Sequence, residues 1–357
     1  MRGFIETLKN IWKIEDLRNR IITTLGFILI YRLGSFVVLP GIDPQQLTNL
    51  KQQTSDGILS MLDMFTGGAF SNASIFALGI MPYISASIVI QLLGIAVPYF
   101  QRLQREGESG RKKINQLTRF LTLAILVFQA PSYLANLSAQ LPPSAFVTSG
   151  FWTYKLPAVI ILTAGTMFIM WLGERITDKG IGNGISLIIM IGIIARLPGA
   201  LLAEFGSRLE EQGGGLVAFL VEIAFLFLVF VAVILLVQGT RRIPVQYAKR
   251  IVGNKQYGGV RQYIPLKVNA AGVMPIIFAQ ALMFIPMMLA SFNTETTTGI
   301  AAAFANYTGF WYNFVFGLLV VVFTYFYTAI TVNPTQMAED MKKNGGFIPG
   351  VKPGRKT

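Results

Sequence analysis

Eight blocks of about 20 predominantly apolar residues run through this 357-residue chain, and they constrain its fold more than any other feature. A helix of about 20 apolar residues is long enough to cross the hydrocarbon core of a bilayer. The sequence therefore predicts an all-α polytopic membrane helical bundle. Its expected spans are residues 21–40, 75–97, 119–137, 156–173, 183–203, 216–238, 269–291 and 310–331.

The chain contains no cysteine and no histidine. Disulfides, the usual zinc and haem ligand sets, and nucleophilic catalysis that relies on histidine are therefore excluded. The expected spans also contain no aspartate, which excludes an intramembrane aspartyl protease. We expect no enzyme activity, no metal and no cofactor. A secondary transporter for a small solute stays open, although the spans are poor in the acidic residues that ion coupling uses.

The positions of the basic residues predict the topology. The net charge is +13, and 25 of the 30 Lys and Arg residues fall on one side of the membrane when the N-terminus is placed in the cytosol. Basic residues are enriched in cytosolic loops, so this split favours a cytosolic N-terminus. Residues 1–20 then form a retained cytosolic amphipathic helix. Arg32 and Glu222 fall within or near spans, and we assign them no role.

Three segments differ from ordinary connectors. Residues 59–74 are apolar, although the topology places them outside the membrane, and Gly67-Gly68 interrupts them. An exposed apolar loop is unfavourable in water, so this segment is expected to pack back into the protein. The loop 239–268 holds seven basic residues and no acidic one, and is expected to form two short elements with a tip. The tail 332–357 is also basic and rich in glycine. Basic loops are, by default, topology signals alone.

Four strings together resemble a known family. They are IFALGIMPYISASIVIQLL at 75–93, GIGNGISLII at 180–189, PLKVNAAGVMPIIF at 265–278 and NGGFIPGVKPG near the end. In this order they are similar to the SecY family of bacterial protein-conducting channels, over about the whole chain. The resemblance implies two pseudo-symmetric halves around a central pore, here residues 21–205 and 206–357. It also implies ten spans, so we expect that the last two are missing from this chain.

The resemblance assigns roles to the apolar parts. Residues 59–74 match the family's plug, a short helix that closes the pore from outside, and its named residues are Met64, Phe65, Gly67, Gly68 and Phe70. The family's ring of apolar pore residues corresponds to Ile80, Ile84, Ile185, Ile189 and Ile277. A dry apolar collar resists ion leakage by dewetting. Polar residues of the lateral gate, through which membrane segments leave, would be Gln91, Thr122 and Asn269.

The resemblance also implies partners in the bacterial plasma membrane. They are the SecE and SecG subunits, the SecA ATPase, the ribosome, the signal sequences of preproteins, and membrane lipids including anionic ones. Docking of SecA or the anionic ribosome is expected on the two basic loops, through Arg241, Arg242, Lys249, Arg250, Lys255, Arg261, Lys352 and Arg355. Lys352 departs from the arginine that is usual in the family, and lysine lacks the bidentate fork of arginine.

Overall fold

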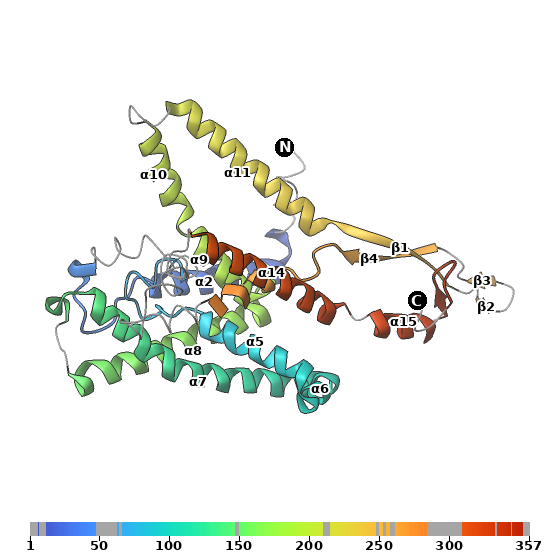
Figure 1. Cartoon of the computed structure of the whole chain (residues 1–357), viewed down its shortest axis with the longest axis horizontal. Coiled ribbons are helices and arrows are strands. Elements are labelled where there is room, and N and C mark those ends of the chain that lie inside the picture. The colour runs from blue at the N-terminus through green and yellow to red at the C-terminus, as the bar shows by residue number, and fades with distance from the viewer. Residues whose placement is uncertain are drawn as a thin grey trace. The chain divides into compact units, whose positions relative to one another are not determined.

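The computed structural model describes residues 6, 12–47, 63, 66–146, 150–209, 215–247, 250–252, 255–257, 261–276, 278–280, 282–283, 309–332, 334–343 and 345–352. Most of these residues are helical (Figure 1). They belong to two compact units, Met1–Glu204 and Phe205–Thr357.

The first unit consists of helices joined by turns. In chain order its elements are α2 (Glu15–Gly34), η1 (Pro44–Gln46), α5 (Met81–Ala96), α6 (Pro98–Arg105), α7 (Glu108–Gln140), η2 (Pro143–Ala145), the π-helix η3 (Phe151–Lys155), α8 (Leu156–Lys179), α9 (Gly184–Ile194) and α10 (Leu197–Leu209), of which the residues from Phe205 on belong to the second unit. Helix α7 packs against α5 and α8, and α8 packs against α2 and α9. The unit is therefore a bundle in which α7 and α8 are central.

Five helices among the described residues are long and apolar enough to cross a membrane, and the bent pair of α5 and α6 adds a sixth. The five are Glu108–Ser138, Phe151–Lys179, Gly184–Leu209, Gly215–Gln238 and Phe310–Ala329. These six correspond to six of the eight expected spans. Helix α2 corresponds to the first expected span and carries arginines near both ends. Most of the seventh expected span, 269–291, lies outside the described residues.

Two span boundaries differ from the expectation. The second span was expected from residue 75, but α5 begins at Met81, with Pro82 in its first turn. Proline is favoured there because its missing N–H needs no intrahelical partner. The fifth expected span consists of two helices, α9 and α10, with a break at Ala195–Arg196. Pro198 follows that break and lies in the first turn of α10.

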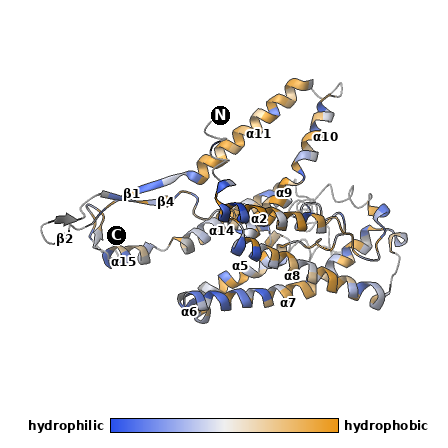
Figure 2. Cartoon of the chain, turned by 180° about the vertical axis from the view of Figure 1, so that it is seen from behind, coloured by the Kyte–Doolittle hydropathy of each residue, from blue (hydrophilic) through white to orange (hydrophobic). Residues whose placement is uncertain are grey.

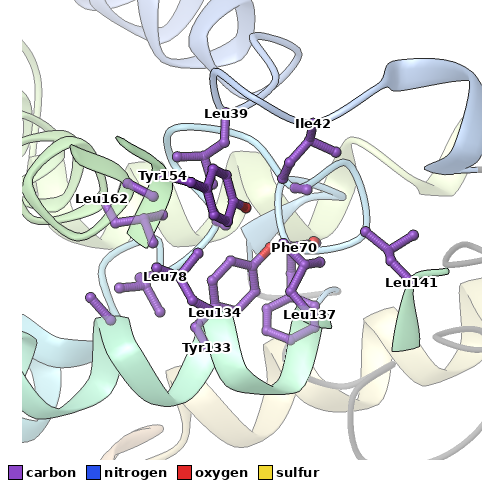
Figure 3. Packing of buried hydrophobic residues seen from close by; sticks show 14 of the residues in the cluster. Leu39, Ile42, Phe70, Leu78, Tyr133, Leu134, Leu137, Leu141, Tyr154 and Leu162 are labelled. Carbon is purple, nitrogen blue, oxygen red and sulfur yellow. Dashed lines mark hydrogen bonds between the residues drawn. The ribbon is translucent and has the colours of Figure 1, made fainter. Parts of the chain in front are cut away.

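The apolar core of the first unit surrounds a segment of successive turns, residues 66–80, which we call the inserted segment. Its Phe70 ring lies 4.9 Å from the Tyr133 ring of α7, in an edge-to-face arrangement. Figure 3 shows this packing, with Leu39 and Ile42 from the chain after α2 and Leu162 from α8 around the same cluster. Residues from α7, from the chain after α2 and from α8 thus enclose the inserted segment.

The second unit combines helices with two small sheets. Its elements are α11 (Gly215–Gln238), β1 (Thr240–Tyr247), β2 (Arg250–Val252), β3 (Lys255–Tyr257), β4 (Arg261–Lys267), α14 (Phe310–Thr331), α15 (Pro334–Lys343) and β5 (Gly346–Phe347). Helix α11 is apolar along its length (Figure 2) and buries no residue within the chain. Such a surface is compatible with lipid rather than water.

The basic loop 239–268 forms a β-hairpin. Strands β1 and β4 pair antiparallel, with Thr240 opposite Lys267, and β2 pairs with β3 beyond them. The prediction of two elements with a tip is therefore confirmed, and strands accompany the helices of the expected all-α bundle. Strand β5 of the tail pairs with β1, so that the sheet order is β4-β1-β5. The two basic segments thus share one sheet.

Candidate functional site

The inserted segment has the backbone of a tight, irregular loop. Gly67, Gly68 and Gly79 have φ values of 66°, 91° and 55°. This left-handed region strongly favours glycine. The resemblance implied a short helix for the plug, residues 59–74; of the residues described there, 63 and 66 are helical and 67–73 form turns. Met64 and Phe65 lie outside the described residues.

The side chains of the inserted segment are buried although the segment is not a regular helix. Ala69, Ala73 and Ala77 have no exposed surface, and Phe70 is 8% exposed. The sequence-based expectation that this apolar loop packs back into the protein is confirmed for the described residues. Burying these side chains is the main favourable contribution to holding the segment in place.

The seat of the inserted segment comes from three helices. A Cβ atom on Gly67 would lie 2.9 Å from the Cα and the carbonyl oxygen of Gly192 in α9, so no larger residue fits there without movement. The Tyr133 hydroxyl of α7 donates to the Phe70 carbonyl at 3.0 Å. The Tyr31 hydroxyl of α2 donates to the Thr66 carbonyl at 3.4 Å. Both carbonyls also accept turn bonds, from the N–H groups of Ala69 and Ala73, so the hydroxyls add a link between the segment and the helices.

Charged groups also reach the segment. Asp63 is 1% exposed, and its carboxylate accepts a hydrogen bond from the Ser71 N–H at 2.8 Å and forms an ion pair with Arg196. Arg196 Nη2 also donates to Ser71 Oγ at 3.2 Å. Arg32 Nη1 of α2 donates to the Gly67 carbonyl at 3.1 Å. Neither Asp63 nor Arg196 was expected to have a role, although a lone acid in an apolar segment is a sequence signal for a functional residue.

The expected pore residues fall in two pairs within the first unit. Ile80 precedes α5 and Ile84 lies one turn later, and both are buried. Ile185 and Ile189 lie one turn apart in α9, and both are partly buried. Ile277 lies outside the described residues. Each described pair therefore lies on one helical face, and their arrangement around one pore stays a proposal.

The expected gate residues have partners close to them in the chain. The Gln91 amide of α5 donates to Ser87 Oγ at 3.3 Å. Thr122 of α7 is fully buried, and its hydroxyl donates to the Thr118 carbonyl at 2.7 Å. In the second unit, Asn269 Oδ1 accepts from the Gly272 N–H at 3.0 Å. Gln91 and Thr122 lie on helices that pack together.

The expected docking residues that the structure describes lie on the two small sheets of the second unit and in the tail. Arg241 and Arg242 are exposed on β1, and Lys352 is exposed after β5. Strands β2, β3 and β4 carry Arg250, Lys255 and Arg261. Lys249 and Arg355 lie outside the described residues. The sheet therefore presents at least two arginine side chains to solvent.

Two further ion pairs lie within or near spans. Glu222 of α11 forms an ion pair with Arg208 at 2.5 Å, and Arg119 of α7 forms a bidentate pair with Glu174 of α8. Among the described residues, no group of three acidic, cysteine or histidine side chains is placed to hold a metal ion.

Comparisons with known proteins agree on one family. The family model described as SecY matches residues 74–357. The chain is 41% identical to protein translocase subunit SecY of Aquifex aeolicus over 355 residues, covering 99% of this chain and 82% of that protein. It also resembles a solved SecY structure whose plug domain is described as stabilising the closed state and maintaining a membrane seal. The TM-score is 0.61 at 17% identity, over 95% of this chain and 79% of that one. Sec61 in a canine ribosome-channel complex gives a TM-score of 0.53 at 17% identity, over 93% of this chain and 77% of that one.

Proposed function

The chain belongs to the SecY family of protein translocase subunits, and on that premise we propose how its parts form and seal a protein-conducting channel. It is a multi-pass channel subunit of the bacterial plasma membrane and not an enzyme. The observation that carries the proposal is the inserted segment, an apolar loop held in a seat made by α2, α7 and α9.

The plug is residues 59–74, and the inserted segment contains its C-terminal part. An apolar plug blocks water and ions while it is seated, and it has to leave before a polypeptide passes. The pore ring consists of Ile80, Ile84, Ile185, Ile189 and Ile277. Their branched side chains close around a chain of varied width and keep the constriction dry. Residues 21–205 and 206–357 are the two halves between which the pore runs.

Signal sequences and membrane segments leave sideways through a gate that includes Gln91, Thr122 and Asn269. Gln91 and Thr122 form hydrogen bonds within their own helices, so these bonds need not break when an apolar signal helix separates α5 from α7. Helices α5 and α7, which carry Gln91 and Thr122, form one side of the gate. Asn269 belongs to the other half of the chain.

The N-terminus and both basic segments face the cytosol, as the distribution of Lys and Arg favours. The hairpin and tail bind SecA and the ribosome, and the ribosome complex of a structural neighbour, canine Sec61, supports the ribosome as a partner. Exposed arginines on β1 suit contacts to RNA phosphates. SecE and SecG complete the channel, and signal-bearing preproteins are its substrates. Anionic lipids lie next to the basic residues on its cytosolic side.

Reconstitution tests this function. The full-length channel is placed in vesicles with SecE and SecG, and a signal-bearing precursor is added with SecA and ATP. We expect protease-protected precursor inside the vesicles, and none when the signal sequence is removed. An absence of protected precursor under conditions in which a known translocon works would contradict the proposed function.

A further inference from the structure

Three charged side chains of the first unit hold the plug by contacts that depend on its seated position. Asp63, within the plug, accepts from the Ser71 N–H and pairs with Arg196, which follows α9. Arg196 also reaches Ser71 Oγ, so one guanidinium group contacts two points of the plug. Arg32 of α2 donates to the Gly67 carbonyl from another helix.

Burial makes the Asp63 carboxylate the sensitive member of this group. Its side chain is 1% exposed, whereas that of Arg196 is 43% exposed. A buried carboxylate has lost its hydration and is stable only if it is paired and hydrogen-bonded. The Arg196 side chain is partly exposed, so its guanidinium group stays hydrated even without Asp63. Asp63 therefore depends on Arg196, and Arg196 depends far less on Asp63.

The contacts of Arg196 and Arg32 with the plug join residues that lie far apart in the sequence. Arg196 lies 133 residues after Asp63, and Arg32 precedes Gly67 by 35 residues. The bonds from Arg196 and Arg32 join the plug to residues outside it, so they are lost together when the plug leaves its seat, whereas the Asp63–Ser71 bond lies within the plug. The intramembrane arginine that the sequence left without a role, Arg32, takes part in this set.

We propose that Asp63, Arg196 and Arg32 form a polar latch that keeps the plug seated and sets how strong a signal sequence must be to open the channel. The proposal rests on the proposed function, because it takes residues 59–74 as the plug. Apolar burial of Ala69 and Phe70 seals the pore, and the latch adds a threshold that is released in one step. A weakened latch thus relaxes selectivity between signal sequences.

The rate of thiol labelling measures how often the plug leaves its seat. An introduced cysteine is the single thiol, since the chain has no cysteine. Ala69 is fully buried in the closed plug, so an Ala69→Cys variant offers one thiol that a membrane-impermeant maleimide reaches only after the plug moves. In the reconstituted complex we expect Arg196→Gln to raise the labelling rate of Cys at 69 roughly ten- to hundredfold, because it orphans a buried carboxylate. Arg32→Leu is expected to raise it less, because only one hydrogen bond is lost.

A double-mutant cycle tests the coupling. Asp63→Asn keeps an acceptor for the Ser71 N–H and leaves no buried charge, so its effect should be smaller than that of Arg196→Gln. In the double variant Asp63→Asn/Arg196→Gln the labelling rate should fall back toward that of Asp63→Asn alone. Wild-type labelling in Arg196→Gln, or simple multiplication of the two single effects in the double variant, would overturn the latch.

Controls separate opening of the latch from misfolding and from failure of the channel itself. Lys155 is an exposed basic residue that the proposed topology places on the same side of the membrane as Arg196. The control variant Lys155→Gln should leave the labelling rate unchanged. Arg196→Lys keeps the charge without the fork and should give an intermediate rate with an unchanged melting temperature. Passage of a precursor with a weakened signal should increase in Arg196→Gln. If no variant passes any precursor, the proposed function fails, whereas the labelling rates still decide the latch.

Discussion

At the scale of residues, glycines in close contact set the position of one proposed pore residue. The N–H of Gly184 donates to the Thr177 hydroxyl at 2.9 Å, and a Cβ on Gly184 would collide with the Gly173 carbonyl. A Cβ on Gly173 would lie 3.0 Å from Cγ1 of Ile185. Helices α8 and α9 thus approach closely because both lack side chains here, as is common in membrane bundles.

Gly184→Ala is expected to lower the free energy of unfolding by about 1–3 kcal/mol, since the helices must separate to admit a methyl group. Gly26→Ala in α2 is the matched control, because nothing lies within 4 Å of its added Cβ. That control should be neutral or stabilise by up to about 1 kcal/mol, the propensity gain of alanine over glycine. Melting temperatures of the two variants check the difference. Equal melting temperatures would show that the Gly173–Gly184 contact does not limit packing.

The sequence predicts which residues are buried better than it predicts which residues contact one another. The apolar composition of residues 59–74 predicted that the plug region is buried, and Ala69, Phe70 and Ala73 are buried. The Asp63–Arg196 pair was not predicted, because nothing local relates two residues 133 positions apart. The assignments of Ile80, Ile84 and Asn269 to pore and gate came from the family resemblance and stay predictions.

At the scale of elements, the hairpin and the tail form one basic unit. Strand β1 lies between β4 and β5, so the tail is tied to the hairpin through two residue pairs, Gln246 with Phe347 and Tyr247 with Gly346. The charge run and the central glycines predicted a long loop with a tip. The pairing with β5 was not predictable, because about 100 residues separate the partners and no pattern in either marks the register.

Charge reversal at Arg241 and Arg242 tests the role of the hairpin in docking. The double variant Arg241→Glu/Arg242→Glu should weaken ribosome binding and reduce the slope of log affinity against log salt by up to about 2, because each lost phosphate contact removes about one unit. Lys155→Glu is the control, since it lies on the opposite side by the proposed topology. Unchanged affinity and slope in the double variant would leave these arginines as topology signals only.

At the scale of the whole molecule, hydrophobicity predicted a polytopic helical protein, and the six candidate spans among the described residues agree. The length of apolar blocks suffices for this because a bilayer admits few alternatives to helices. The irregular inserted segment was not predictable in form, since its turns depend on a seat built by α2, α7 and α9. The chain divides into two compact units, and the plug, residues 59–74, belongs to the first of them.

The central claim is that residues 59–74 seal a protein-conducting channel, and the ion conductance of the resting channel tests it most directly. In planar bilayers, the full-length complex should be nearly silent without precursor, and the same complex lacking residues 59–74 should conduct ions because the apolar seal is gone. The deletion should also admit a precursor with a weakened signal sequence. Resting conductance and signal selectivity that both equal those of the intact channel would contradict the account.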